Sequence, residues 1–207
     1  MIQLRTNTAT EGAINRSFNA GVTQNAGAVM VLQEQYISGA AIANSTTETS
    51  LYTIAKFVPS MAGSVYTSPS TLVTIPANYL SLGLLYTGKI VGSIANTGTP
   101  NLRTRVVLRN SAGTVTYTIS DTTATAMTTV STVDFEVNFD MMVASVGTTG
   151  SVVGRISHRY ATTTVYAAPA AVTVDTTAQY TIDVLLTWGA ASASNTVTPF
   201  WSVMEIR

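Results

Sequence analysis

Apolar and polar residues alternate along most of the chain from residue 49 onward. The clearest case is VDFEVNFDMMVASV, residues 133–146, where Val, Phe and Met alternate with Asp, Glu and Asn. Residues 180–188 follow the same rule, with Tyr180, Ile182 and Trp188 on one side and Asp183 on the other. Side chains two residues apart lie on the same face of a strand. The pattern therefore predicts antiparallel strands with one dry face and one wet face.

About ten such segments are separated by clusters of Gly, Pro, Asn, Thr and Ser, such as NTGTPN and GTTG, which favour turns. The segments span residues 49–58, 70–76, 83–95, 101–110, 114–121, 133–146, 150–163, 170–175, 179–189 and 196–207. No long amphipathic helical pattern competes with them. Short strands at this spacing predict an all-β fold, an antiparallel two-sheet jelly-roll sandwich over residues 49–207.

Residues 1–48 have a different composition, with small and polar residues around isolated apolar ones. We interpret this segment as an extended N-terminal arm, with a short strand or helical turn around AVMVLQEQYI. Ordering so many residues costs about 1 to 2 kcal/mol each in backbone entropy. A segment with so few large apolar residues does not recover that cost on its own domain. We expect the arm to cross neighbouring subunits, with four apolar contact residues: Met30, Leu32, Tyr36 and Ile37.

Charge is scarce and balanced. Lys and Arg total 10, Asp and Glu total 10, and charged residues make up 10% of the chain, against roughly 25% in a typical soluble domain. A nucleic-acid binder needs excess positive charge, so we expect no nucleic-acid partner. With so little repulsion between copies, we expect a homo-oligomer or a permanent partner.

The sequence lacks most of the residues that thiolate and metal chemistry require. The chain has no Cys and one His, His158, so thiolate sites are excluded and we expect neither a metal nor another cofactor. No basic segment precedes an apolar one at the N-terminus, and no run of 18 apolar residues occurs. We therefore expect no signal peptide and no membrane association, with assembly in a cytoplasm.

The acids of residues 133–146 have two interpretations. Asp134, Glu136 and Asp140 share a strand face with neighbours about 7 Å apart, a spacing compatible with a glycosidase pair. The same geometry describes a solvated face whose acids pair with arginines of an adjacent strand, either residues 103–109 or residues 155–159. We favour the structural interpretation, and we expect no enzymatic activity.

His158 and Lys89 each suggest a site that their surroundings do not support. Ser157 is adjacent to His158 in the sequence, so the two point to opposite strand faces and cannot form a catalytic triad. We expect His158 to face a core or an interface. Lys89 follows two glycines at the spacing of a phosphate-binding loop, but Ile90 replaces the required Ser or Thr and the context is a strand.

Large aromatic residues gather near the C-terminus. Alternation places Trp188 on the dry face and puts Phe200 and Trp201 on opposite faces. Aromatic residues are enriched at the centres of interfaces. Trp201 is therefore the fifth candidate partner-binding residue, while a role within the core stays an alternative.

Two stretches resemble a family. TIPANYLSLGLLYTGKIVGSIANTGTPNLRTRVVL, residues 74–108, and VTVDTTAQYTIDVLLTWGAASASNTVTPFWSVMEI, residues 172–206, resemble a jelly-roll module of virion structural proteins of tailed bacteriophages. Capsid decoration (cement) proteins and fibres contain this module. The resemblance implies a virion component, usually trimeric, and brings no catalytic residues.

These observations lead to two functional hypotheses. The first is a phage capsid cement protein, a homotrimer on the head surface, whose arm staples copies of the major capsid protein. The second is a fibre or baseplate protein that binds a receptor or glycan through loops such as RYATTTVYAAP, residues 159–169. A third, a glycosidase acting through Asp134 and Glu136, is remote.

Overall fold

The computed structural model describes residues 30–35, 41–52 and 73–207, and all regular structure in these ranges is β-strand. The first seven strands are β1 Met30–Gln35, β2 Ile42–Ala43, β3 Thr49–Ser50, β4 Val73–Ile75, β5 Leu85–Asn96, β6 Asn101–Arg109 and β7 Val115–Asp121. The others are β8 Thr125–Ala126, β9 Val130–Ser145, β10 Gly150–Tyr160, β11 Thr163–Tyr166, β12 Ala170–Val174, β13 Tyr180–Trp188 and β14 Thr196–Ile206. The predicted all-β class is confirmed.

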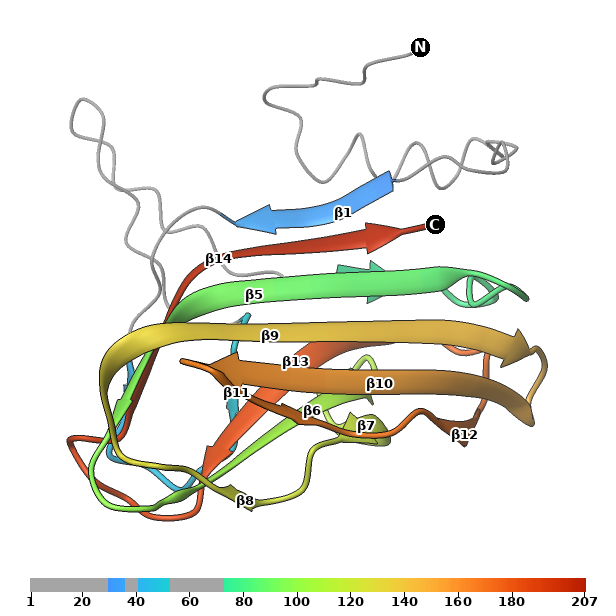
Figure 1. The fold of residues 1–207 in the computed structure, drawn as a ribbon. Helices are drawn as coiled ribbons and strands as arrows, with labels where there is room; N and C mark the ends of the chain where they lie inside the picture. The colour runs from blue at the N-terminus through green and yellow to red at the C-terminus, as the bar shows by residue number, and fades with distance from the viewer. Residues whose placement is uncertain (1–29, 36–40, 53–72) are drawn as a thin grey trace, which may run out of the picture.

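The strands form two antiparallel sheets that pack as a sandwich (Figure 1). The large sheet has the order β1-β14-β5-β9-β10-β11, with β2 also on β14 and β12 also on β10. The small sheet has the order β3-β13-β6-β7, with β4 on β13 and β8 on β6. In Figure 1 the large sheet is nearer the viewer, and β13 and β6 cross behind it.

The chain alternates between the sheets as in a jelly roll. In the large sheet β14 lies between β2 and β5, and in the small sheet β13 lies between β3 and β6. The last two long strands are thus inserted between early strands in both sheets, which is how two Greek keys combine into a jelly roll. The predicted jelly-roll sandwich is confirmed, and β10, β11 and β12 extend its large sheet.

The first strands come from the segment interpreted as an arm. β1 pairs with the C-terminal half of β14 through Met30 and Ile206, and β2 pairs with its N-terminal half through Ile42 and Val197. They lie one after the other along the same edge of β14 (Figure 1). Residues 1–29 and 36–40 lie outside the described residues, so the course of the extended arm stays a prediction, as does its boundary at residue 48.

The core lies between the sheets and is built from the dry positions of the alternating strands. From β9 these include Phe135, Val137 and Phe139, each at most 2% exposed. Fully burying such a side chain contributes roughly 1.5–3 kcal/mol. Gly88 of β5 lies directly against this layer, because a Cβ there would be 2.1 Å from Cε1 of Phe139. The missing side chain leaves room for the Phe139 ring.

A bulge changes the alternation near the end of β14. Trp188 is buried, as expected. The register of β14 against β5 shifts between Pro199 and Trp201, which inserts Phe200 as an extra residue. Pro199 and Ser202 are buried, whereas Phe200 is exposed and Trp201 is partly exposed. The prediction that Phe200 and Trp201 occupy opposite faces is therefore wrong, because the bulge turns both away from the core.

Candidate functional site

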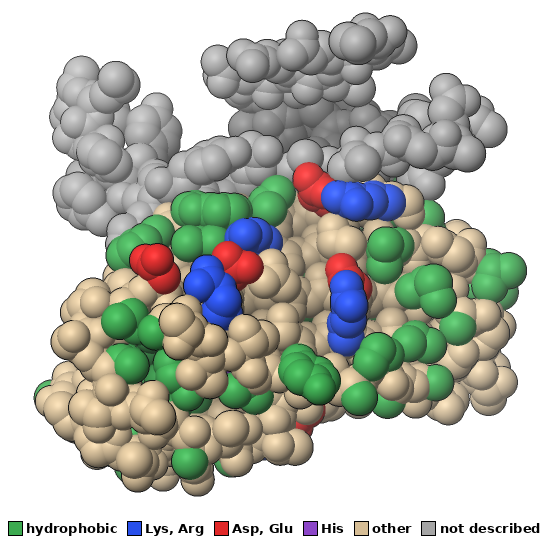
Figure 2. Space-filling view, viewed as in Figure 1, with side chains coloured by type: hydrophobic (Ala, Val, Ile, Leu, Met, Phe, Trp, Pro, Cys, Tyr) green, Lys and Arg blue, Asp and Glu red, His purple; other side chains and the backbone are tan. Residues whose placement is uncertain are grey.

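The acids of β9 lie on the outer face of the large sheet and contact basic side chains of both neighbouring strands. Glu136 lies 3.0 Å from Nζ of Lys89 on β5 and 3.5 Å from Nη2 of Arg159 on β10. Asp140 pairs with Arg155 of β10. Figure 2 views this face and shows basic and acidic side chains in adjacent pairs. The expected pairing with the arginines of residues 155–159 is thus confirmed for Glu136 and Asp140, whereas Asp134 is exposed and forms no ion pair with the described residues.

The protonation state of Glu136 follows from these contacts. The Asn138 side chain donates a 2.6 Å hydrogen bond to Oε1. That bond lowers the pKa of Glu136 and, with Lys89 and Arg159, outweighs the opposing effect of partial burial. The general acid of a glycosidase needs a raised pKa. Glu136 has the opposite shift, and its contacts are those of a structural ion pair.

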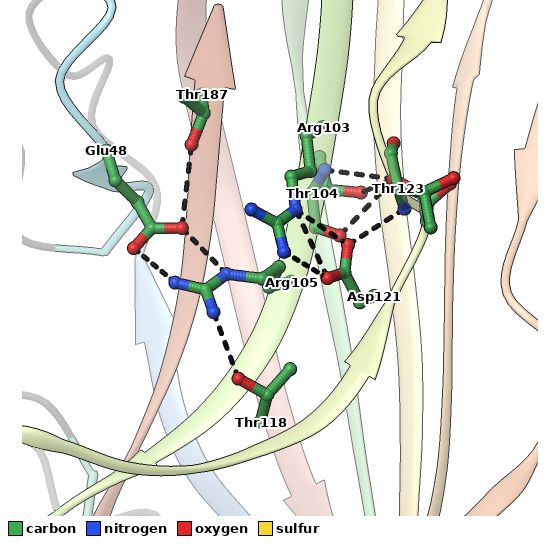
Figure 3. A network of polar contacts seen from close by, with 9 residues as sticks. Glu48, Arg103, Thr104, Arg105, Thr118, Asp121, Thr123 and Thr187 are labelled. Carbon is green, nitrogen blue, oxygen red and sulfur yellow. Dashed lines mark hydrogen bonds and ion pairs between the residues drawn. The ribbon is translucent and has the colours of Figure 1, made fainter.

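The arginines of β6 face the other way, on the outer face of the small sheet. Arg103 pairs with Asp121 of β7, and Arg105 donates hydrogen bonds to Glu48 and, at 3.0 Å, to Thr118 (Figure 3). These arginines had been considered as partners for the β9 acids. That alternative is wrong, because β6 and β9 belong to different sheets.

Arg109 has the most buried partner of this face. Its Nε donates a 2.8 Å hydrogen bond to Oδ2 of Asp183, whose side chain is 1% exposed. The Ser50 hydroxyl donates to Oδ1 of the same carboxylate. Burial raises the pKa of Asp183, although Ser50 and Arg109 oppose that effect. Asp183 had been placed on a wet face, but it is buried.

His158 lies in the core between the sheets, as expected for an inward position. Its Nδ1 is 3.0 Å from Oγ1 of Thr104 on β6, so it forms a polar contact between the two sheets. Nε2 is buried and has no hydrogen-bond partner among the described residues. Burial lowers the pKa of His158 to about 4, so the ring is neutral near pH 7. The ring lies near Phe135 and Tyr160, and Ser157 is on the opposite strand face.

The five candidate partner-binding residues are not brought together as a described site. Met30 and Leu32 lie in β1, and only their backbone is described. Tyr36 and Ile37 lie outside the described residues. Trp201 is partly exposed on the outer face of the large sheet, with Nζ of Lys89 5.9 Å from the ring centroid, a cation–π contact.

A hollow on the outer face of β9, β10 and β11 was not predicted as a site. Its volume is about 460 Å³. It is lined by Asn138, Asp140, Arg155, Ile156, Ser157, Thr164, Tyr166, Ala167 and Pro169. Four of these belong to the loop RYATTTVYAAP, which was considered for glycan binding. The loop was therefore visible in the sequence as a candidate, but the polar side chains of β9 that complete the hollow, Asn138 and Asp140, belong to a different segment of the chain.

Two kinds of site are not found in the described ranges. No group of three or more His, Asp or Glu side chains there is arranged to hold a metal ion. In residues 30–35, 41–52 and 73–207, no helix has the length and hydrophobicity needed to cross a membrane.

A comparison of the sequence with protein-family models gave no match, and a comparison with curated proteins gave none either. The class of the molecule is therefore defined by its fold: it is an all-β protein with two antiparallel sheets packed as a jelly-roll sandwich.

Proposed function

We propose that this protein is a structural component of a phage virion, a cement protein that binds the outside of the head. In this proposal a homotrimer contacts several copies of the major capsid protein, and its N-terminal segment crosses from one copy to the next. A protein that binds only the assembled shell stabilises that shell by mass action, without any catalytic step.

The pairing of charges carries the proposal. Within the described ranges each Lys and Arg has an acidic partner in the same chain. No unpaired basic patch is therefore left there to bind phosphate groups. The large exposed apolar side chains include Leu82, Met142 and Val146. A neutral surface with exposed apolar residues is suited to contact with other proteins.

The choice of a phage head among protein partners depends on the resemblance of residues 74–108 and 172–206 to virion jelly-roll modules. The trimer and the head-surface location depend on the same resemblance. The stapling role of the N-terminal segment depends on its composition, since it has few residues that could form a core of their own.

A truncation tests the stapling role, and the fold determines where it is made. Removal of residues 1–45 would delete β1 and β2, whereas removal of residues 1–29 keeps every described strand. The test therefore uses the protein without residues 1–29. We expect this truncated protein to remain a folded oligomer by circular dichroism and light scattering. We also expect it to lose cosedimentation with heads that lack the protein.

Two results would contradict the proposal. One is that the truncated protein binds heads as tightly as the full chain. The other is a copy number of only a few per purified particle, since a cement protein is present in hundreds of copies. Arg155→Met is the matched control for the truncation, because it changes the surface of the large sheet and leaves residues 1–29 in place.

A further inference from the structure

We propose that the hollow on β9, β10 and β11, defined by the nine lining residues given above, binds a neutral saccharide. This inference does not depend on the cement function, because the hollow contains none of the residues assigned to the stapling role. It assigns a ligand class to a specific place in the fold.

The register of the strands brings the key side chains together. Ser157 of β10 pairs with Asn138 of β9 on one side and with Tyr166 of β11 on the other. Directly paired residues of neighbouring strands point to the same face of a sheet. Asn138, Ser157 and Tyr166 therefore form one row across the outer face. Arg155 and Asp140, also paired across β9 and β10, form the next row.

Tyr166 supplies the apolar contact. Its side chain is 75% exposed, which is unusual for a large aromatic residue. It lies at the edge of the sheet, where β11 is the last strand. A sugar ring presents a face of C–H groups that packs on an aromatic ring. An exposed tyrosine at the wall of a polar hollow fits that kind of contact.

The polar side chains match hydroxyl groups. Arg155 donates through Nε to Oδ2 of Asp140, and in the described residues its Nη atoms and Oδ1 of Asp140 have no other protein partner. Asn138 and Ser157 also line the hollow, where an amide oxygen can accept a hydrogen bond and a hydroxyl can both donate and accept. Planar donors and acceptors beside each other can bind two adjacent hydroxyl groups of one ring.

The charge balance selects neutral ligands. The lining contains one carboxylate and one guanidinium, and they form an ion pair with each other. A phosphorylated or acidic ligand would have to compete with Asp140 for Arg155, and it would find no other basic residue in the lining. The volume of about 460 Å³ lies within the range of roughly 300–1,000 Å³ of small-ligand sites.

The test uses the full-length protein on an array of immobilised neutral and sialylated oligosaccharides. Neutral sugars that the protein binds on the array are then titrated as free methyl glycosides by NMR. We expect a dissociation constant on the order of 1 mM for a single ring in so open a site. Binding of sialylated members alone, or of no member, would overturn the proposal.

Three variants locate the binding. Tyr166→Ala is expected to weaken it about tenfold through loss of the stacked ring, and Tyr166→Phe is expected to retain it within about threefold. Phe200→Ala is the matched control, since Phe200 is an exposed aromatic residue of β14, and β5 lies between β14 and β9, the nearest strand of the hollow. Affinity that survives Tyr166→Ala, with all three variants folded, would overturn the assignment.

Discussion

The outer faces of the two sheets are built from similar alternating strands, but their ion pairs differ in solvent exposure. On the large sheet, Arg155 is 65% exposed and its partner Asp140 is partly exposed. On the small sheet, Arg109 is 22% exposed and its partner Asp183 is only 1% exposed. The same sequence pattern thus gives an ion pair in water on one face and a buried ion pair on the other.

The difference comes from what lies beside each strand. β13 is a central strand of the small sheet, and β3 pairs with it at Leu185 and Ser50. Ser50 contacts Asp183, and Glu48, two residues earlier, pairs with Arg105 of β6. A short segment from elsewhere in the sequence therefore completes the polar network of the small sheet. Outer faces cannot be assumed to be wet from alternation alone.

The largest expected effect tests the buried pair. Arg109→Met leaves the Asp183 carboxylate buried without its cation, and we expect a loss of about 3 kcal/mol in the free energy of unfolding at pH 7. The pKa of Asp183 is already raised by burial. Protonation would remove the unpaired charge, so the loss should be smaller at pH 5. Urea unfolding at the two pH values measures both quantities.

A second substitution shows whether the stability lost in Arg109→Met comes from the unpaired charge of Asp183 or from lost packing. Asp183→Asn combined with Arg109→Met removes both charges, and we expect the double variant to be more stable than Arg109→Met alone at pH 7. If the double variant is the less stable one, the buried charge is not the source of the loss, and the proposed contrast between the two faces fails.

The second-largest expected effect comes from His158, which lies in the core between the two sheets. His158 has a folded-state pKa of about 4, against 6.5 when unfolded, so between these values the unfolded chain binds the additional proton. The contribution of His158 to the free energy of unfolding is therefore fully present above pH 6.5, and it is lost as the pH decreases towards 4. From pH 7 to pH 5 we expect a loss of about 2 kcal/mol in the free energy of unfolding, measured with urea.

His158→Gln separates this effect from the outer ion pairs. The amide can still bond to Thr104 but does not titrate, so the variant should have nearly constant stability between pH 7 and pH 5. The carboxylates of both faces are unchanged in it. A variant that remains as sensitive as the original protein would assign the acid response to the outer faces instead.

The local elements could be predicted from the sequence, whereas the contacts between distant elements could not. The segment 101–110 contains β6, and the inward position of His158 followed from alternation. The burial of Asp183 depends on Ser50, which is 133 residues away. The hollow depends on the register that pairs Ser157 with both Asn138 and Tyr166. Alternation within one strand predicts which face a side chain takes, but the residue opposite it also depends on the partner strand and on the turn that joins the two.

The smallest expected effect completes the comparison. Arg155→Met removes the exposed partner of Asp140, and exposed ion pairs contribute roughly 0 to 1 kcal/mol because water and side-chain entropy offset the attraction. We expect a loss below about 1 kcal/mol, and a smaller one in about 0.5 M salt, where the Debye length is only several ångströms. Both values come from urea unfolding beside Arg109→Met. A loss as large as that of Arg109→Met would show that the two faces are energetically alike, even though one is exposed and the other is buried.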